Sequence, residues 1–215
     1  MKMIQINKNL TTINYKKASN RNIKYIVIHY TANNGDTAKG NTNYFKNEYR
    51  GASAHYFVDE TSIWQCVEDK DISWHCGAKK YMHTYCRNEN SIGIEMCSRK
   101  DGNYYFKEQT IKNTVELVKE LMKKYNISIE NVIRHYDVTG KVCPEPYVRD
   151  INAWNDFKNK LRDNYITSAN DITWELNHTY FPITDTQKFV SELDKAKKEN
   201  SSLYWGYYKL VNRIK

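Results

Sequence analysis

Arg134-His135-Tyr136-Asp137-Val138-Thr139-Gly140-Lys141-Val142-Cys143-Pro144 is the segment around which the rest of this chain can be interpreted. His135 and Cys143 stand eight positions apart, and a turn at Thr139-Gly140 would bring the two ends of the segment together. An imidazole and a thiolate that converge suit zinc, which binds nitrogen at about 2.1 Å and sulfur at about 2.3 Å. Catalytic zinc sites typically use three protein ligands and leave the fourth position to water. The segment therefore predicts two of three zinc ligands.

His29 is the candidate for the third ligand. It closes an apolar run, residues 24–30, that is typical of a buried strand ending in a polar side chain. Glu95 stands in another apolar run, residues 91–97, where an ionisable group costs several kcal/mol unless it is paired or faces a cleft. Taken alone, a histidine at a strand end is more often structural, and a single His–Cys pair is a weak metal pattern. The occurrence of His29, Glu95 and the His135–Cys143 pair in one chain is what favours a metal site.

Several segments together resemble one family, the zinc N-acetylmuramoyl-L-alanine amidases related to peptidoglycan recognition proteins. The likeness is to the phage endolysins and bacterial autolysins of that family, and it extends from about Ile23 to about Leu161. The segments that carry it, in the family's order, are Tyr25-Ile26-Val27-Ile28-His29-Tyr30-Thr31-Ala32, Ser53-Ala54-His55-Tyr56-Phe57-Val58, Ser73-Trp74-His75-Cys76-Gly77, Asn90-Ser91-Ile92-Gly93-Ile94-Glu95 and the segment from Arg134 to Pro144.

The resemblance implies a zinc ion held by His29, His135 and Cys143. It also agrees with Glu95 as the acid and base. Lys141 stands two residues before Cys143 and is therefore placed to stabilise the oxyanion, although a solvated loop lysine is the alternative. The bond cut would be the amide between the lactyl group of N-acetylmuramic acid and L-alanine of the stem peptide. The residue types alone indicate only a zinc-dependent amide hydrolase.

Substrate contacts are predicted from the same resemblance. Trp74 and His75 belong to an element that lies beside the substrate groove in the family, although Trp74 could instead fill the edge of a sheet. Some family members place a catalytic tyrosine where this chain has Ala54 or His55. We expect His55 either to line the cleft and donate to substrate or to be a structural residue of a hairpin.

Composition narrows the class of partner. The chain has 215 residues, 40% of them hydrophobic, and a net charge of +8, which favours polyanions such as nucleic acid, an anionic membrane or a cell wall with anionic polymers. Motifs that cradle phosphate or stack on bases are absent, which disfavours a nucleic-acid binder. A glycosidase usually needs a pair of carboxylates, whereas this pattern offers one, Glu95, beside the metal ligands, which disfavours a glycosidase. A non-catalytic peptidoglycan-binding domain remains the alternative, but such domains typically lack the cysteine that Cys143 supplies.

The sequence also bears on location. Residues 1–7 contain no apolar segment of signal-peptide type, and no run approaches the ~20 apolar residues that span a membrane. We therefore expect synthesis in the cytoplasm without a signal peptide, with access to the wall after lysis or through a holin-like pore. The five cysteines, an odd number without a C-x-x-C pair, are expected to be reduced thiols.

The periodicity of the chain predicts an α/β fold, a central mixed β-sheet flanked by helices. Strands are expected at residues 23–29, 53–58, 63–67, 91–97 and 131–135, with a hairpin turn at residues 59–62. Helices are expected at residues 37–46, 108–125 and 150–163, the last with Ile151, Trp154, Phe157 and Leu161 facing inward. We expect a catalytic domain over residues 1–163.

Residues 168–215 are expected to form a small all-α domain. Capping signatures at residues 168–171 and 184–187 each precede an apolar period, and a third helix is expected at residues 202–214. Three short helices have marginal stability alone. We therefore expect these residues to form either a cell-wall-binding module or an oligomerisation module, and the second would make the protein a homo-oligomer. Trp205, Tyr207 and Tyr208 are either wall contacts or packed core.

Overall fold

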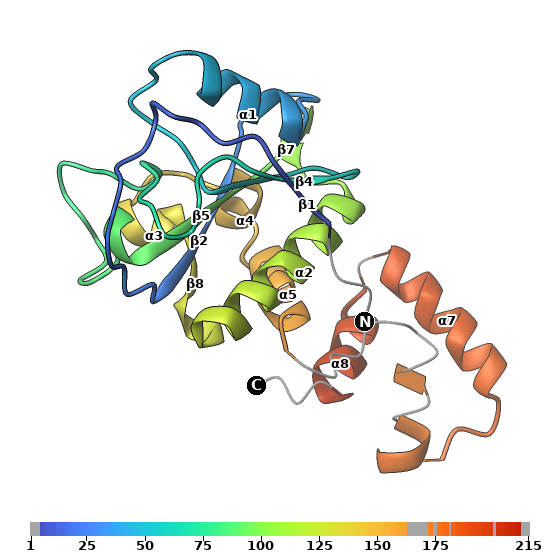
Figure 1. Cartoon of the computed structure of the whole chain (residues 1–215). Coiled ribbons are helices and arrows are strands. Elements are labelled where there is room, and N and C mark those ends of the chain that lie inside the picture. Colours follow the sequence, from blue (N-terminus) through green and yellow to red (C-terminus); the bar gives the residue numbers. More distant parts are fainter. Residues whose placement is uncertain (1–4, 163–171, 174–175, 181, 200, 212–215) are drawn as a thin grey trace. The chain divides into compact units, whose positions relative to one another are not determined.

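The computed structural model describes residues 5–162, 172–173, 176–180, 182–199 and 201–211, and the chain forms two compact units, Met1–Leu161 and Arg162–Lys215 (Figure 1). The helices and strands of the first unit are β1 (Ile6–Lys8), β2 (Tyr25–Tyr30), α1 (Ala38–Asn47), β3 (Tyr56–Val58), β4 (Ile63–Gln65), η1 (Asn88–Asn90), β5 (Ser91–Met96), β6 (Arg99–Asp101), β7 (Asn103–Tyr105), α2 (Glu108–Tyr125), η2 (Ile129–Asn131), β8 (Val132–Arg134), α3 (His135–Thr139), α4 (Glu145–Arg149) and α5 (Ile151–Lys160).

A six-stranded mixed sheet in the order β1-β4-β3-β5-β2-β8 is the centre of the first unit. The pair β3–β4 is antiparallel, and the other neighbours are parallel. The predicted fold class, a mixed sheet flanked by helices, is therefore confirmed. The three strands β5, β2 and β8 run in the same direction, so their carboxyl ends meet at one edge, where ligand sites of open α/β sheets form.

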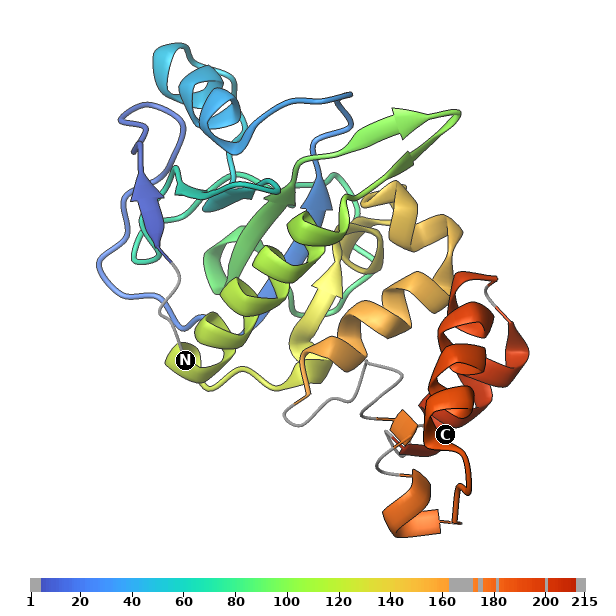
Figure 2. The same cartoon turned by 90° about the vertical axis from the view of Figure 1, so that its right-hand side faces the viewer.

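The two faces of this sheet have different neighbours because successive side chains of a strand point to opposite sides. Ile26 and Ile28 of β2 belong to the main hydrophobic cluster, together with residues of α2 and α5. Figure 2 shows these two helices side by side against the sheet. Tyr25 and Val27 belong to a separate cluster on the other face. His29 follows Val27 in this alternation and therefore points away from α2 and α5.

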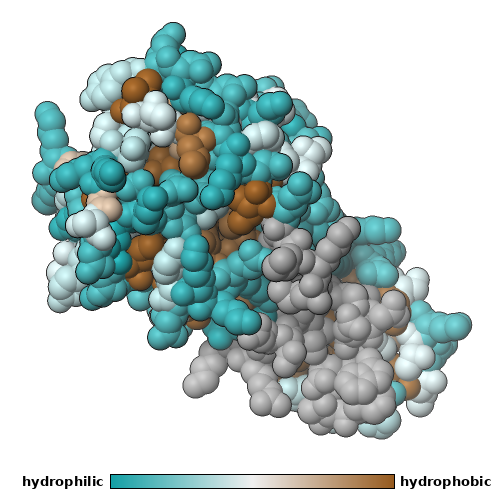
Figure 3. All heavy atoms as spheres, in the orientation of Figure 1, coloured by the Kyte–Doolittle hydropathy of each residue, from teal (hydrophilic) through white to brown (hydrophobic). Residues whose placement is uncertain are grey.

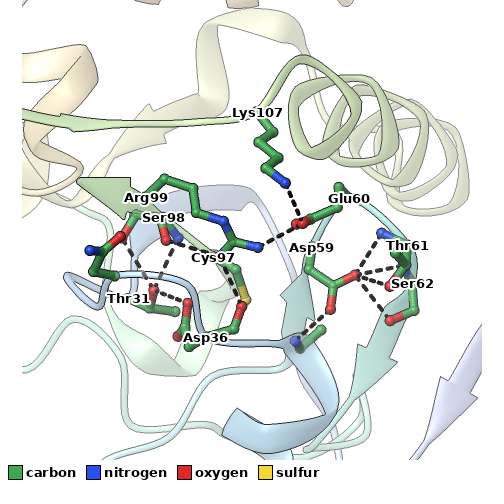
Figure 4. Close-up of polar contacts among 12 residues, drawn as sticks. Thr31, Asp36, Asp59, Glu60, Thr61, Ser62, Cys97, Ser98, Arg99 and Lys107 are labelled. Carbon is green, nitrogen blue, oxygen red and sulfur yellow. Dashed lines mark hydrogen bonds and ion pairs between the residues drawn. The ribbon is translucent and has the colours of Figure 1, made fainter. Parts of the chain in front are cut away.

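The predicted hairpin between residues 53 and 67 forms, with shorter strands than expected. The carboxylate of Asp59 accepts the backbone N–H groups of Thr61 and Ser62 at 2.8 and 2.7 Å, which closes the turn (Figure 4). Its second oxygen accepts the N–H of Ala38 at 2.8 Å and so joins the hairpin to the start of α1. The Thr37 hydroxyl caps this helix by accepting from Gly40 N–H at 3.1 Å.

The longest helix matches its prediction, whereas α5 ends at Lys160, before the predicted end at residue 163, and one of its residues points the other way. α2 spans Glu108–Tyr125 and ends at Asn126, whose φ of 52° is the left-handed conformation common after helices. In α5, Asp150 accepts from the N–H groups of the first turn, as its capping role predicts. Trp154 and Phe157 are buried, but Ile151 is 52% exposed, so its predicted inward orientation is wrong. Ile151 is the first helical residue and lies on the outer side of the first turn.

The second unit contains η3 (Leu176–Tyr180), α7 (Thr186–Lys198) and α8 (Ser202–Val211). The cap of α7 is Asp185, one residue later than the first residue of the capping signature predicted at residues 184–187. The other predicted signature, at residues 168–171, lies outside the described residues. Tyr208 is 3% exposed within the unit's hydrophobic cluster, and Trp205 and Tyr207 pack against that cluster. The packed-core interpretation therefore holds for Tyr208, and its exposure as a wall contact is corrected.

The surface gives two further observations. On the face drawn in Figure 3, hydrophilic residues cover most of the first unit and hydrophobic ones appear in small separate groups. Among the described residues, no helix has both the length and the apolar character needed to cross a membrane.

Candidate active site

Strand register brings the predicted site residues together. His29 of β2 pairs directly with Glu95 of β5, so their side chains lie on the same face of the sheet. On the other side of β2, Ile28 pairs with Arg134, and His135 is the next residue along the chain. Sequence reasoning placed these side chains at one end or face of a sheet, and the structure has them at the carboxyl ends of three adjacent parallel strands.

A short helix, rather than the loop expected from the sequence, returns Cys143 to His135. β8 ends at Arg134 and α3 begins at His135, so the histidine is the first helical residue and not the last of a strand. Gly140 ends α3 with a φ of 81°, and Tyr136 N–H then donates to the Cys143 carbonyl at 2.8 Å. The ends of the segment therefore meet, although the turn that joins them is the end of a helix.

His29, His135 and Cys143 form a cluster whose ligand atoms all lie within 4.8 Å of one another. Nδ1 of His29 is 3.8 Å from Sγ of Cys143, close to the separation of about 3.5 Å between ligands of a tetrahedral zinc ion. All three side chains are buried. Burial raises the pKa of the Cys143 thiol to about 12 and lowers the pKa of His135 to about 3, because desolvation disfavours charge.

The cluster fits a metal ion on evidence from its own atoms. Nδ1 of His135 is buried and has no hydrogen-bond partner, an arrangement that costs free energy unless another group, such as an ion, completes it. Two imidazoles and one thiolate are a donor set typical of catalytic zinc, and three protein ligands leave one position open. His29, His135 and Cys143 would hold such an ion.

Glu95 lies beside this cluster. Its Oε1 is 4.0 Å from Nδ1 of His29, and its Oε2 is buried without a hydrogen-bond partner. Burial raises the pKa of this carboxyl to about 8, with Lys141 opposing the shift. A cation bound by the neighbouring cluster would lower that pKa, because a nearby positive charge favours the carboxylate. Perturbed carboxyl groups of this kind in a cleft are typical of functional sites.

Two adjoining hollows surround the cluster. One, of about 750 Å³, contains His29, Glu95 and Cys143 and extends to α1. The other, of about 710 Å³, extends towards Gly77 and Asn88. Trp74 and Lys141 line both hollows, together with His135, so they stand where the two join. Lys141 is exposed there. Trp74 therefore borders the cleft, as expected of a substrate contact.

His55 does not reach either hollow. It is fully buried, and its Nδ1 lies 3.0 Å from the backbone N–H of Gly93 and 2.7 Å from the Ser73 hydroxyl. Its Nε2 lies 3.1 Å from the Asp71 carbonyl. Because both ring nitrogens are engaged inside the protein, this arrangement favours the second of the two alternatives for His55, a structural residue, over a contact with substrate. His55 joins the hairpin to the following loop and to β5.

His75 lines both hollows but has little surface to offer a substrate. Its side chain borders the cleft with 9% of the residue exposed. Nδ1 lies 3.0 Å from Nε2 of His29, and Nε2 lies 3.0 Å from the hydroxyl of Ser91. Both nitrogens are thus used by protein groups, so the predicted substrate contact of His75 stays a prediction, and it would involve the exposed part of the ring rather than its nitrogens.

Sequence reasoning missed the role of Gly93. A Cβ atom on this residue would lie 2.5 Å from the ring of His75, so only glycine leaves room for the imidazole above β5. A signal was present in the sequence, because a glycine inside a strand often marks the close approach of another group. The identity of that group required the folded structure.

Comparison with known proteins points to one family. The sequence profile of the Amidase_2 family, described as N-acetylmuramoyl-L-alanine amidase, matches residues 19–146. A probable N-acetylmuramoyl-L-alanine amidase of Bacillus licheniformis is 39% identical over 147 residues, 65% of this chain and 41% of that protein. CwlL, an N-acetylmuramoyl-L-alanine amidase of the same species, is 34% identical over 171 residues, 74% of this chain and 47% of CwlL.

A solved structure shows the same fold. The catalytic domain of XlyA matches with a TM-score of 0.62 and 30% identity, over 74% of this chain and 100% of that domain. The chain spans about half the length of the curated relatives it matches. The family profile covers more than half of the chain, and it includes His29, Glu95, His135 and Cys143. The resemblance drawn from the sequence is therefore confirmed, and the chain belongs to the Amidase_2 family of N-acetylmuramoyl-L-alanine amidases.

Proposed function

We propose that this protein hydrolyses the amide bond between N-acetylmuramic acid and L-alanine of the stem peptide in bacterial peptidoglycan, and so lyses the cell wall. The proposal depends chiefly on one observation, the convergence of His29, His135 and Cys143 within 4.8 Å. Glu95 beside this cluster supplies an acid or base. Family membership supplies the substrate class, because the matched relatives are named for this activity.

Zinc held by the three ligands would supply Lewis acidity towards water and towards the lactyl carbonyl. The carboxylate of Glu95 accepts a proton from the attacking water as the oxygen bonds to the carbonyl carbon. When the carbon–nitrogen bond breaks, the same carboxyl returns that proton to the departing amine of L-alanine. The reaction thus consumes one water and leaves a lactyl carboxylate and a free amino terminus.

Lys141 and Trp74 act on the rest of the substrate. The ammonium of Lys141 stabilises the carbonyl oxygen as negative charge develops on it, since the residue is exposed where the two hollows meet. Trp74 packs against the substrate beside the scissile bond, with the sugar and the peptide extending into different hollows. The net charge of +8 favours a wall that carries anionic polymers.

The decisive experiment treats purified cell walls with the protein and identifies the new chain ends. An amidase releases new L-alanine amino termini without new reducing sugar ends. Reducing ends alone would overturn the proposal. Binding to walls without any new ends would favour the alternative, a non-catalytic peptidoglycan-binding protein. Glu95→Gln is the matched control, because it removes the base and changes little of the shape.

The second unit enters the proposal only as a module that accompanies the catalytic unit. Its hydrophobic cluster, built around Tyr204 and Tyr208, provides a small core. We propose wall binding as its role. A homo-oligomer formed through its helices remains a prediction. Deletion of residues 168–215, followed by measurement of wall retention and molecular mass, tests both.

A further inference from the structure

His29 needs a defined proton position to act as a ligand. Its Nδ1 faces Sγ of Cys143 at 3.8 Å and Oε1 of Glu95 at 4.0 Å, so Nδ1 is the nitrogen that must offer a lone pair. The proton of the neutral ring then belongs on Nε2, because an imidazole carries it on one nitrogen only. His29 is 1% exposed, so Nε2 cannot donate to bulk water. Nδ1 of His75, 3.0 Å away, can accept that N–H.

The direction of this hydrogen bond is set at the other end of a short chain of groups. For Nδ1 of His75 to accept, the proton of His75 must sit on Nε2, which lies 3.0 Å from the Ser91 hydroxyl. That hydroxyl must donate elsewhere, and it lies 2.6 Å from the carbonyl oxygen of Arg87. A carbonyl can only accept. Reversing the chain would leave two oxygens at 2.6 Å without a proton between them, so the carbonyl fixes every donor in turn.

The ring of His75 is also held sterically. It lies above Gly93, where a Cβ atom would approach the ring to 2.5 Å. The backbone of the residue is fixed by Asn88, whose side-chain oxygen accepts the N–H of His75 at 3.1 Å and that of Cys76 at 2.9 Å. The register of β2 and β5 explains how the ring of His75 reaches both His29 and Ser91. Val27 pairs with Gly93, and this pair lies between the pairs His29–Glu95 and Tyr25–Ser91. His75 therefore bridges β2 and β5 on the face of the sheet that bears the site.

We infer that His75 is a positioning residue, which holds His29 as the Nε2-protonated tautomer with Nδ1 directed at the metal site. Ser91 and the Arg87 carbonyl set the polarity of the chain, and Gly93 provides the space for the ring. The inference rests on the proposed function, since it concerns a ligand of the proposed zinc ion. A hydrogen-bond partner of this kind raises the basicity of a ligand and fixes its orientation.

Two variants of His75 separate this role from the others. The amide oxygen of Asn reaches the place of Nδ1, so His75→Asn keeps an acceptor for His29. The amide of Gln reaches the place of Nε2, so His75→Gln keeps contact with Ser91 and loses the acceptor. Zinc affinity, measured by competition with a chromophoric chelator, should fall by about 10- to 100-fold in His75→Gln and by less than about threefold in His75→Asn.

A second measurement needs neither zinc nor activity. In the metal-free protein, long-range nitrogen–proton NMR correlations report which imidazole nitrogen carries the proton. Wild-type His29 should be protonated at Nε2, and His75→Gln should lose this single tautomer. Ser91→Ala removes the hydroxyl that accepts from Nε2 of His75, and it should weaken zinc binding less than His75→Gln does. Circular dichroism of each variant in chelator checks that the fold is retained.

The possible outcomes distinguish the inference from the proposed function. Equal zinc affinity in wild type and His75→Gln would overturn the inference alone. A raised KM for wall fragments with unchanged zinc affinity would do the same, because it would make His75 a substrate contact. Protonation of wild-type His29 at Nδ1 would also contradict it. A wild-type protein that binds no zinc would overturn the proposed function and the inference together.

Discussion

The two faces of the central sheet are built from the same strands but have opposite properties. On one face, Ile26, Ile28 and Ile94 are fully buried against α2 and α5, within a cluster of hydrophobic side chains. On the other face, the neighbouring positions carry His29 and Glu95, two ionisable groups that line a hollow. The alternation of a strand thus lets one face stabilise the fold while the other holds reactive groups.

The difference lies in the kind of group that each face carries. A buried polar atom without a hydrogen bond destabilises the folded state by about 1–3 kcal/mol. Glu95 Oε2 and His135 Nδ1 are of this kind at the site, and Thr110 Oγ1 and the Tyr147 hydroxyl are of this kind away from it. Only the two at the site belong to groups that can bind a metal ion or move a proton, as is common where function is served. Substitutions on the two faces should therefore separate cleanly, with chemistry lost on one and stability lost on the other.

The largest effect is expected for Cys143→Ser, which removes a direct ligand on the reactive face. Zinc affinity should fall by more than the 10- to 100-fold typical for loss of an outer partner, at least about 1000-fold, and wall hydrolysis should fall with it. Metal content after dialysis measures the first and the release of L-alanine amino termini the second. Cys66→Ser, at a buried thiol away from the cluster, is the control and should retain zinc. One zinc per chain in Cys143→Ser would contradict the assignment.

Glu95→Gln should separate binding from turnover on the same face. The amide keeps the shape of the side chain but cannot accept the proton of the attacking water, so kcat should fall by about 10²- to 10⁴-fold. Zinc content should be unchanged. Glu116→Gln, at an exposed position of α2, is the matched control and should keep full activity. Full activity in Glu95→Gln would remove this residue from the mechanism.

The same contrast explains what the sequence could and could not predict. The period of α2 and the apolar runs of β2 and β5 depend on local patterns, so both elements were predictable. The pairing of His29 with Glu95 depends on strand register, which no local pattern reports. His135, His29 and Cys143 were nevertheless named in advance, because the segments that carry them occur together and in the order of one family, although each residue taken alone is a weak signal.

Histidines near β5 show the limit most clearly. His55 and His75 both precede that strand in the chain, each two residues after a serine, and no local pattern distinguishes their roles. The fold turns His55 towards Ser73 and the Gly93 backbone, and it turns His75 towards His29. α3 was missed for a related reason. Its single turn is stabilised by Asp137, which pairs with Arg134 at 2.7 Å, and such short helices have no apolar period.

Leu117→Ala tests the other face of the sheet. Leu117 is fully buried in the main cluster, so its truncation should lower the free energy of unfolding by about 2–5 kcal/mol. Zinc affinity should stay within about threefold of wild type, because α2 covers the face that lacks the ligands. Denaturant unfolding and the chelator competition measure the two quantities. A large loss of zinc affinity would show that the faces are coupled rather than separate.

The pH dependence of stability tests the same contrast at Asp69, which joins α2 to β3. Its carboxylate accepts from Lys124 at 2.8 Å and from the hydroxyls of Tyr125 and Tyr56. Although burial opposes ionisation, these bonds lower the pKa of Asp69 below its ordinary value of 3.8. Its stabilising effect is therefore present above that value and is lost as the pH falls through the lower folded pKa. Thermal unfolding of Asp69→Asn should depend less on pH below about 4 than that of wild type.

Ile151→Ala should have the smallest effect and is the matched control for Leu117→Ala. The side chain is 52% exposed at the first position of α5, so little apolar surface is lost when it is truncated. Alanine also has the higher helix propensity, which offsets part of that loss. The free energy of unfolding should change by less than about 0.5 kcal/mol, as for most surface substitutions. A cost comparable to that of Leu117→Ala would mean that the first turn of α5 is buried, and the hydrophobic face would then extend beyond the core seen here.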